Sequence, residues 1–339
     1  MTSTNVNEKV VVLGTGGTIA GTASNVSDNI GYTAAQVGVD QLLGAIPGLS
    51  KVLAGRLLVS EQVAQIDSKD MSFPVWQQLA LRVNHYLMQA DVRGVVITHG
   101  TDTLEETAYF LHAVLPSALL ASKPVVLTCA MRPASSAAPD GPQNLMDAVA
   151  VTLTPGASGV VAVCAGTVHG AVDVQKIHTY RVDAFNSGDA GPLGYIEEGR
   201  VRLLRNWPLA QAASAQVAIE KLAKMSLWPR VEIVMNYAGA SGAIVDALVS
   251  HGSQASQNGA QHSDVAPLRG LVVAATGNGT VHRDLEAALL RAHAAGVTVV
   301  LATRCASGRV LPTPASAFPD SRGLSPVKAR VALMLALMR

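Results

Sequence analysis

Apolar, β-prone runs recur along the whole chain and are separated by segments with helical periodicity. The eight runs comprise residues 10–13, 56–59, 95–98, 125–129, 159–163, 231–236, 271–276 and 297–303. Runs made almost wholly of Val, Ile and Leu are typical of parallel strands that are buried on both faces. Because strand and helix patterns alternate, the sequence predicts an α/β fold built on a doubly wound sheet.

The length of the chain and a break in this alternation predict two domains. A chain of 339 residues is too long for one ordinary core. The alternation stops over residues 195–227, where Glu197-Glu198-Gly199 fits a hairpin turn and the rest fits a linker. We therefore expect a larger N-terminal doubly wound sheet domain over residues 1–205, a linker over 206–227, and a smaller C-terminal α/β domain over 228–339.

Charge and hydropathy exclude several kinds of partner. The formal net charge is only +1, whereas a nucleic-acid surface needs a concentrated basic patch. The sequence holds no uninterrupted apolar run of about eighteen residues, so we expect no membrane span. Residues 1–9 are mostly polar and unlike the apolar core of a signal peptide, which predicts a cytoplasmic protein.

Cysteine and histidine spacing gives no sign of a disulfide framework or a metal site. Cys129, Cys164 and Cys305 lie in or beside apolar runs, and their odd number without CxxC spacing predicts buried free thiols in a reducing compartment. The nine histidines form neither an HxxxH pair nor a Cys/His cluster. We therefore expect no metal.

The first apolar run ends in the glycine-rich turn Gly14-Thr15-Gly16-Gly17-Thr18-Ile19. A dinucleotide-binding fingerprint would need glycine where Ile19 stands, and a phosphate-binding P-loop would need lysine at Thr22. Two interpretations remain. The segment is either a plain tight turn or a turn that presents the hydroxyl groups of Thr15 and Thr18.

The third run ends in a second hydroxyl-rich turn, Thr98-His99-Gly100-Thr101-Asp102-Thr103. Asp102 fits a plain role as cap of the following helix, for which Thr103 and Glu106 have the spacing of a capping box. Thr101, however, is expected to direct its hydroxyl toward the carboxyl ends of the strands, where α/β proteins bind ligands. The two turns thus predict one shared pocket.

A threonine hydroxyl is a weak nucleophile until a base removes its proton. The candidate base is Lys176, since a lysine acts as a base when burial lowers its pKa. Asp102 is the carboxylate that would orient the amine. A solvated surface lysine is the alternative interpretation of Lys176.

Together the two turns resemble the signature segments of bacterial-type L-asparaginases. The resemblance covers residues 15–20 and 98–108, and it extends in family order to Tyr32, 37–39, Ser68, 70–71, 130–133, 140–142, 191–194 and 277–279. It implies an enzyme that converts L-asparagine to L-aspartate and ammonia, with a minor activity on L-glutamine and no cofactor. It also implies a homotetramer with active sites between subunits.

The resemblance assigns the catalytic roles by position. Thr15 would be the nucleophile on a mobile lid, with Tyr32 as its hydroxyl partner. Thr101, Asp102 and Lys176 would form a second catalytic group.

The resemblance also assigns substrate contacts. Ser68 and Asp102 would hold the α-carboxylate and the α-amine, and Asn278 would come from a neighbouring subunit. Backbone N–H groups near Gly14 and Gly100 would face the oxyanion that forms when a hydroxyl attacks an amide.

The sequence departs from the family pattern at two places. Lys69 stands where many relatives have glutamine or glutamate, and it would pair with the substrate carboxylate or turn to solvent. Secreted relatives have a glutamate just after the strand that corresponds to residues 297–303. Residues 304–309 of this chain contain no glutamate, and Asp320 comes too late to replace it. The second departure predicts a weaker grip on the α-amine and a higher KM.

Two further functions compete with the hydrolase. One is the ammonia-donating, asparaginase-like subunit of a tRNA-dependent amidotransferase. The other is an amino-acid sensor that keeps the pocket without turnover. The presence of Thr15, Thr101, Asp102 and Lys176 together argues against the sensor.

Overall fold

A computed structural model describes residues 8–208, 219–257, 266–314 and 316–338. The chain forms two compact units, Met1–Ala223 and Lys224–Arg339. Their boundary falls inside the segment 206–227 that we expected to link two domains. Each unit is described by itself below.

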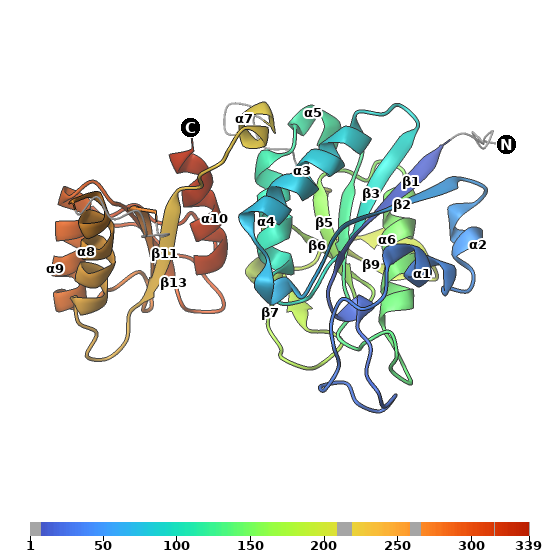
Figure 1. Cartoon of the computed structure of the whole chain (residues 1–339), viewed down its shortest axis with the longest axis horizontal. Helices are drawn as coiled ribbons and strands as arrows, with labels where there is room; N and C mark the ends of the chain where they lie inside the picture. The colour runs from blue at the N-terminus through green and yellow to red at the C-terminus, as the bar shows by residue number, and fades with distance from the viewer. Residues whose placement is uncertain (1–7, 209–218, 258–265, 315, 339) are drawn as a thin grey trace. The chain divides into compact units, whose positions relative to one another are not determined.

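The first unit alternates strands and helices in the order expected from the sequence (Figure 1). Its strands are β1 (Lys9–Gly16), β2 (Leu57–Ile66), β3 (Val92–Thr98), β4 (Val125–Thr128), β5 (Val160–Cys164), β6 (Thr167–Gly170), β7 (Gln175–Lys176), β8 (Phe185–Asn186), β9 (Gly194–Glu197) and β10 (Arg200–Leu203). Its helices are η1 (Thr18–Ala20), α1 (Val39–Gly44), α2 (Leu49–Leu53), η2 (Ser68–Asp70), α3 (Phe73–Leu87), α4 (Leu104–Val114), α5 (Ser117–Leu120), α6 (Gly141–Leu153), η3 (Gly188–Ala190) and α7 (Ile219–Ala223).

The main sheet has the strand order β10-β9-β6-β5-β4-β3-β1-β2. Strands β1 to β5 pair in parallel, and β6, β9 and β10 add antiparallel strands at one side. Helices α3 and α4 cover one face of the sheet, and α1, α2 and α6 cover the other (Figure 1). The expected doubly wound architecture is confirmed. Because chain order reverses between β1 and β3, the ends of these two strands form the topological switch point, where such sheets bind ligands.

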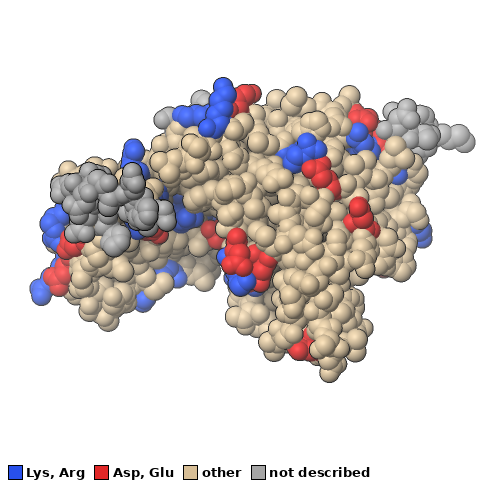
Figure 2. Space-filling view, in the orientation of Figure 1, with Lys and Arg blue, Asp and Glu red and all other residues tan. Residues whose placement is uncertain are grey.

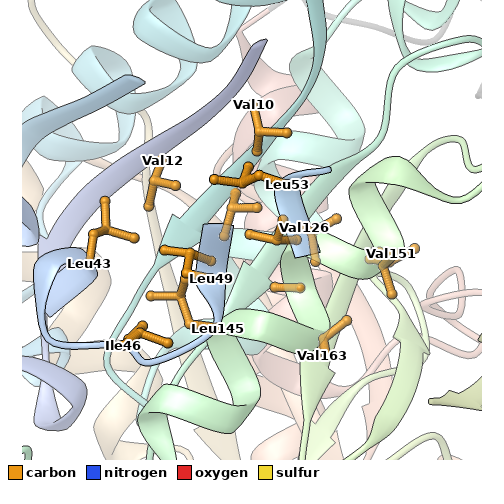
Figure 3. Packing of buried hydrophobic residues seen from close by; sticks show 14 of the residues in the cluster. Val10, Val12, Leu43, Ile46, Leu49, Leu53, Val126, Leu145, Val151 and Val163 are labelled. Carbon is orange, nitrogen blue, oxygen red and sulfur yellow. The ribbon is translucent and has the colours of Figure 1, made fainter. Parts of the chain in front are cut away.

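The core follows from the alternation of side chains along each strand. Val10 and Val12 of β1 point to the same face, where they join a buried cluster with side chains of α1, α2, β4, α6 and β5 (Figure 3). Val11 and Leu13, which point the other way, are also fully buried. Strand β1 therefore lies at the centre of the unit and holds the turn that follows it in a fixed place.

Of three local predictions, the hairpin is confirmed, the buried thiols are confirmed in part, and the capping box is wrong. The hairpin is confirmed as β9 and β10, and Glu198 and Gly199 both have positive φ, as a two-residue hairpin turn requires. Cys305 is exposed, so the prediction of buried thiols is correct only for Cys129 and Cys164. The prediction of a capping box at the start of α4 is wrong. Thr103 makes no side-chain cap and instead donates its hydroxyl to the Ser68 carbonyl.

The second unit is a three-layer α/β sandwich of its own. Its elements are β11 (Arg230–Met235), α8 (Ala243–Gln257), β12 (Leu268–Ala275), α9 (Arg283–Ala294), β13 (Thr298–Thr303) and α10 (Pro326–Leu337). The strands are parallel in the order β11-β12-β13. Helix α9 begins after the His282 cap and ends before Gly296, which has the positive φ that suits glycine at this position.

Charged residues are sparse and mixed in sign on the face shown in Figure 2, without a broad basic patch. No helix in the described part of the chain is long and apolar enough to cross a membrane.

Candidate active site

Two glycine turns pack against each other at the switch point. Gly16 and Gly17 both have positive φ, and they end β1 so that Thr18 opens the short helix η1. A Cβ atom on Gly17 would overlap the backbone of Gly100, which follows β3. The contact places Thr18 and Thr101, each the next residue along the chain, at the same edge of the sheet.

This close packing predicts a large effect for Gly17→Ala. The variant has to adopt the φ of 82° and ψ of −171° of Gly17, a backbone region essentially restricted to glycine, which costs about 1–3 kcal/mol. It also has to push the two turns apart. Gly156→Ala is the matched control, because Gly156 has φ +78° and open space around it. In urea unfolding we expect the Gly17 variant to be the less stable of the two, and it should also lose turnover. Equal stability and activity in both variants would contradict the packing argument.

Lys176 connects the second turn to the two-stranded piece formed by β7 and β8. Its Nζ donates to Thr101 Oγ1 at 2.7 Å and to Asp102 Oδ1 at 2.5 Å. The Lys176 side chain is 18% exposed and the Asp102 side chain 52%. A hydroxyl, an amine and a carboxylate thus lie within hydrogen-bonding distance of one another. This is the geometry that activation of a hydroxyl nucleophile or of water requires.

Ser68 ties the end of β2 to the second turn. It is 2% exposed, its Oγ accepts from the Asp102 amide at 3.1 Å, and its carbonyl accepts from the Thr103 hydroxyl at 2.8 Å. A side chain on Gly100 would collide with the Ser68 hydroxyl. The structure therefore brings Ser68, Gly100, Thr101, Asp102 and Lys176 together, as the sequence predicted.

Thr15 does not lie in the turn. It belongs to β1, is 1% exposed, and donates its hydroxyl to the Thr98 carbonyl at 2.9 Å. The Tyr32 hydroxyl lies 2.6 Å from Thr18 Oγ1 instead. The predicted pairing of Tyr32 with Thr15 is therefore wrong, because β1 continues to Gly16 and the chain leaves the sheet only from Gly17 onward.

Thr18, whose hydroxyl the sequence placed in the turn, is thus the functional candidate to which the sequence interpretation gave no catalytic role. The available signal was the Gly16-Gly17 pair, since two consecutive glycines suit the positive φ values with which a turn begins. The first hydroxyl after that pair belongs to Thr18.

His99 is a buried residue that contacts the backbone of the second turn. It is fully buried, and burial lowers its pKa to about 4, so its ring is neutral at physiological pH. The neutral ring then donates from Nδ1 to the Gly100 carbonyl, 2.7 Å away. We interpret His99 as a structural support of the turn.

Three other predicted site residues lie in different surroundings. Gly14 is inside β1, in register with Gln62 of β2 and Thr98 of β3, so it does not belong to the turn. Lys69 is 61% exposed and pairs with Asp70 at 2.8 Å and Asp67 at 3.2 Å.

Asn278 belongs to the second unit. Its side chain donates to the Leu311 carbonyl at 3.1 Å and accepts from the Leu311 amide at 2.6 Å. These two bonds fix the position of the amide within its own unit.

The fold and this site define an α/β protein with hydroxyl groups and a lysine–carboxylate pair at its switch point. Two family models match the chain: "Asparaginase, N-terminal" over residues 9–209 and "Glutaminase/Asparaginase C-terminal domain" over residues 230–339. The chain belongs to the asparaginase family.

Named relatives agree with this assignment. L-asparaginase 2 of Escherichia coli is 38% identical over 97% of this chain and 88% of its own length. The glutaminase-asparaginase of Pseudomonas fluorescens is 34% identical over 97% and 86%. The crystal structure of a probable cytoplasmic L-asparaginase from Campylobacter jejuni has a TM-score of 0.86, at 36% identity over 98% of this chain and 95% of its own. Neither the amidotransferase subunit nor the sensor gains support from these names.

Proposed function

We propose that this chain hydrolyses the side-chain amide of L-asparagine to L-aspartate and ammonia, with a minor activity on L-glutamine. The observation that carries the proposal is the position of the Lys176 amine, which contacts both Thr101 and Asp102. Thr18 lies after the first turn, which packs against the second turn, and its hydroxyl contacts the Tyr32 hydroxyl.

The nucleophile in this proposal is Thr18 rather than Thr15. The Thr15 hydroxyl donates to a backbone carbonyl inside the sheet, and a carbonyl cannot serve as the base for attack. The Thr18 hydroxyl attacks the amide carbon, with Tyr32 holding it in place. Ammonia leaves, and an ester between Thr18 and the substrate acyl group remains.

The base in this proposal is the group formed by Thr101, Lys176 and Asp102. The Thr18 proton passes through the Thr101 hydroxyl to the Lys176 amine and then to the amide nitrogen, which leaves as ammonia. Asp102 keeps the amine oriented. The same group then activates the water that hydrolyses the ester. These steps use only the substrate amide, side chains and water, so the proposed reaction requires no cofactor or metal.

The proposed oxyanion donor is the backbone near Gly100, and Gly14 no longer qualifies because it lies within β1. Ser68 and Asp102 are the proposed partners of the substrate α-carboxylate and α-amine. Lys69 is the less suitable carboxylate partner, since Asp67 and Asp70 already hold it. Asn278 would come from a neighbouring subunit of a homotetramer. We also propose a cytoplasmic location, which the name of the Campylobacter relative supports.

Kinetics on the two amides test the proposed substrate. Asparagine and glutamine differ by one methylene, and packing against one methylene discriminates by about 1–3 kcal/mol, or roughly 10–200-fold. We expect ammonia release from both amides, with kcat/KM in favour of asparagine by a factor in that range. Equal kcat/KM values would refute the preference. If neither asparagine nor glutamine releases ammonia, the hydrolase function is refuted and the sensor is favoured.

A further inference from the structure

Two buried thiols meet at the ends of neighbouring strands. Cys129 directly follows β4, and Cys164 is the last residue of β5. The strands are parallel with Thr128 opposite Val163, so the next residue on each strand is a cysteine. The two Sγ atoms lie 3.1 Å apart, and the residues are 1% and 3% exposed. Neighbouring strands are about 4.8 Å apart, and a disulfide needs Cα atoms about 4.4–6.8 Å apart, so the backbone can accommodate a bond.

The thiol pair is connected to the first catalytic turn through packing. Ala130, which follows Cys129, forms a small buried cluster with Ile19 and Ala20. Ile19 follows Thr18, the proposed nucleophile. A displacement of Cys129 is therefore passed through Ala130 to the helix η1 that carries Thr18.

A buried asparagine holds both strand ends in place. Asn144 of α6 donates to the Cys129 carbonyl at 2.9 Å and accepts from the Ala165 amide at 2.9 Å. These two bonds keep the two strand ends side by side, so the two cysteines stay within reach of each other. Bonded sulfur atoms lie about 2 Å apart, so forming the bond draws them about 1 Å closer.

We propose that Cys129 and Cys164 are a modification site: a hydroperoxide oxidises them to an intramolecular disulfide that lowers turnover reversibly. One thiolate attacks the peroxide oxygen and becomes a sulfenic acid, with release of one water. The second thiol displaces the hydroxyl of that sulfenic acid, the sulfur–sulfur bond forms, and a second water leaves. In sum, two thiols lose two electrons and two protons, and hydrogen peroxide is reduced to two waters.

The chemistry of the pair makes this reaction slow. The hydrogen bond with the Cys164 thiol and burial raise the pKa of Cys129, so little thiolate exists at neutral pH. The positive charge of Lys176 acts in the opposite direction and has the smallest effect on this pKa. The pair should therefore stay reduced in ordinary buffer and respond to sustained peroxide.

The test uses the Cys305→Ser protein, which lacks the exposed thiol. After incubation with hydrogen peroxide, free thiols are alkylated under denaturing conditions and the digest is analysed by mass spectrometry. We expect a peptide pair linked through Cys129 and Cys164, and a fall in kcat of tenfold or more, since a misplacement of about 1 Å can cost about 10²-fold. Dithiothreitol should reverse both.

The matched control adds Cys164→Ala to the same protein, and peroxide should leave its kcat unchanged. The proposal is overturned if no linked peptide forms although Cys305 of the wild-type protein is oxidised. It is also overturned if the linkage forms without a change in kcat, or if the control loses activity equally, as methionine oxidation would cause. The effect on turnover rests on the proposed function, whereas the linkage is read from mass alone, so the two failures are distinguishable.

Discussion

Replacing Lys176 by methionine is expected to lower kcat on L-asparagine by about 10²–10⁴-fold, the usual contribution of a general base. Methionine keeps much of the side-chain volume but has no amine to accept the proton from Thr101. Thermal stability should change little, because a partly exposed ion pair contributes about 0–1 kcal/mol. Steady-state ammonia release and a melting curve measure the two effects.

Lys51→Met is the matched control for this variant. Lys51 is an exposed lysine in α2, outside the candidate site. It should retain the wild-type kcat. If Lys176→Met also retains it, Lys176 is a structural lysine and the base must be sought elsewhere.

Removing one hydroxyl at a time should separate Thr18 from Thr15. We expect Thr18→Val to abolish turnover with little effect on folding, since it removes the attacking oxygen. Thr15→Val should keep most of the turnover but lose about 1 kcal/mol of stability, because the Thr98 carbonyl loses a hydrogen-bond donor. Urea unfolding and kcat, measured on both variants, decide between the two residues. The opposite pattern, with Thr15→Val inactive and Thr18→Val active, would restore Thr15 as the nucleophile.

The central strands were predictable because each is a continuous apolar run whose burial on two faces leaves a clear pattern. Strands β6, β9 and β10 lie at the side of the sheet and have only four residues each, so they carry no such pattern. The hairpin of β9 and β10 was predicted only from the turn between them. The helix α7 within the predicted linker is also short, with five residues. Short elements at an edge depend on contacts with the finished sheet, which a local pattern does not contain.

The sequence likewise identified some residues of the candidate site and placed another incorrectly. The motif at residues 98–103 identified Thr101 and Asp102. The need for a base pointed to Lys176, and the resemblance gave it the same role, although 75 residues separate it from Thr101. The position of Thr15 was predicted incorrectly, because the sequence does not show where β1 ends. The strand continues three residues beyond the predicted run, to Gly16, which places Thr15 inside the sheet and leaves Thr18 in the turn.

Locating the acyl group during turnover tests the mechanism most directly. The enzyme is mixed with L-asparagine, quenched in acid within one turnover and digested, and the aspartyl ester is assigned by fragmentation of the modified peptide. We predict an aspartyl group on Thr18. An aspartyl group on Thr15 or Thr101, or turnover without any ester, would contradict the proposed mechanism.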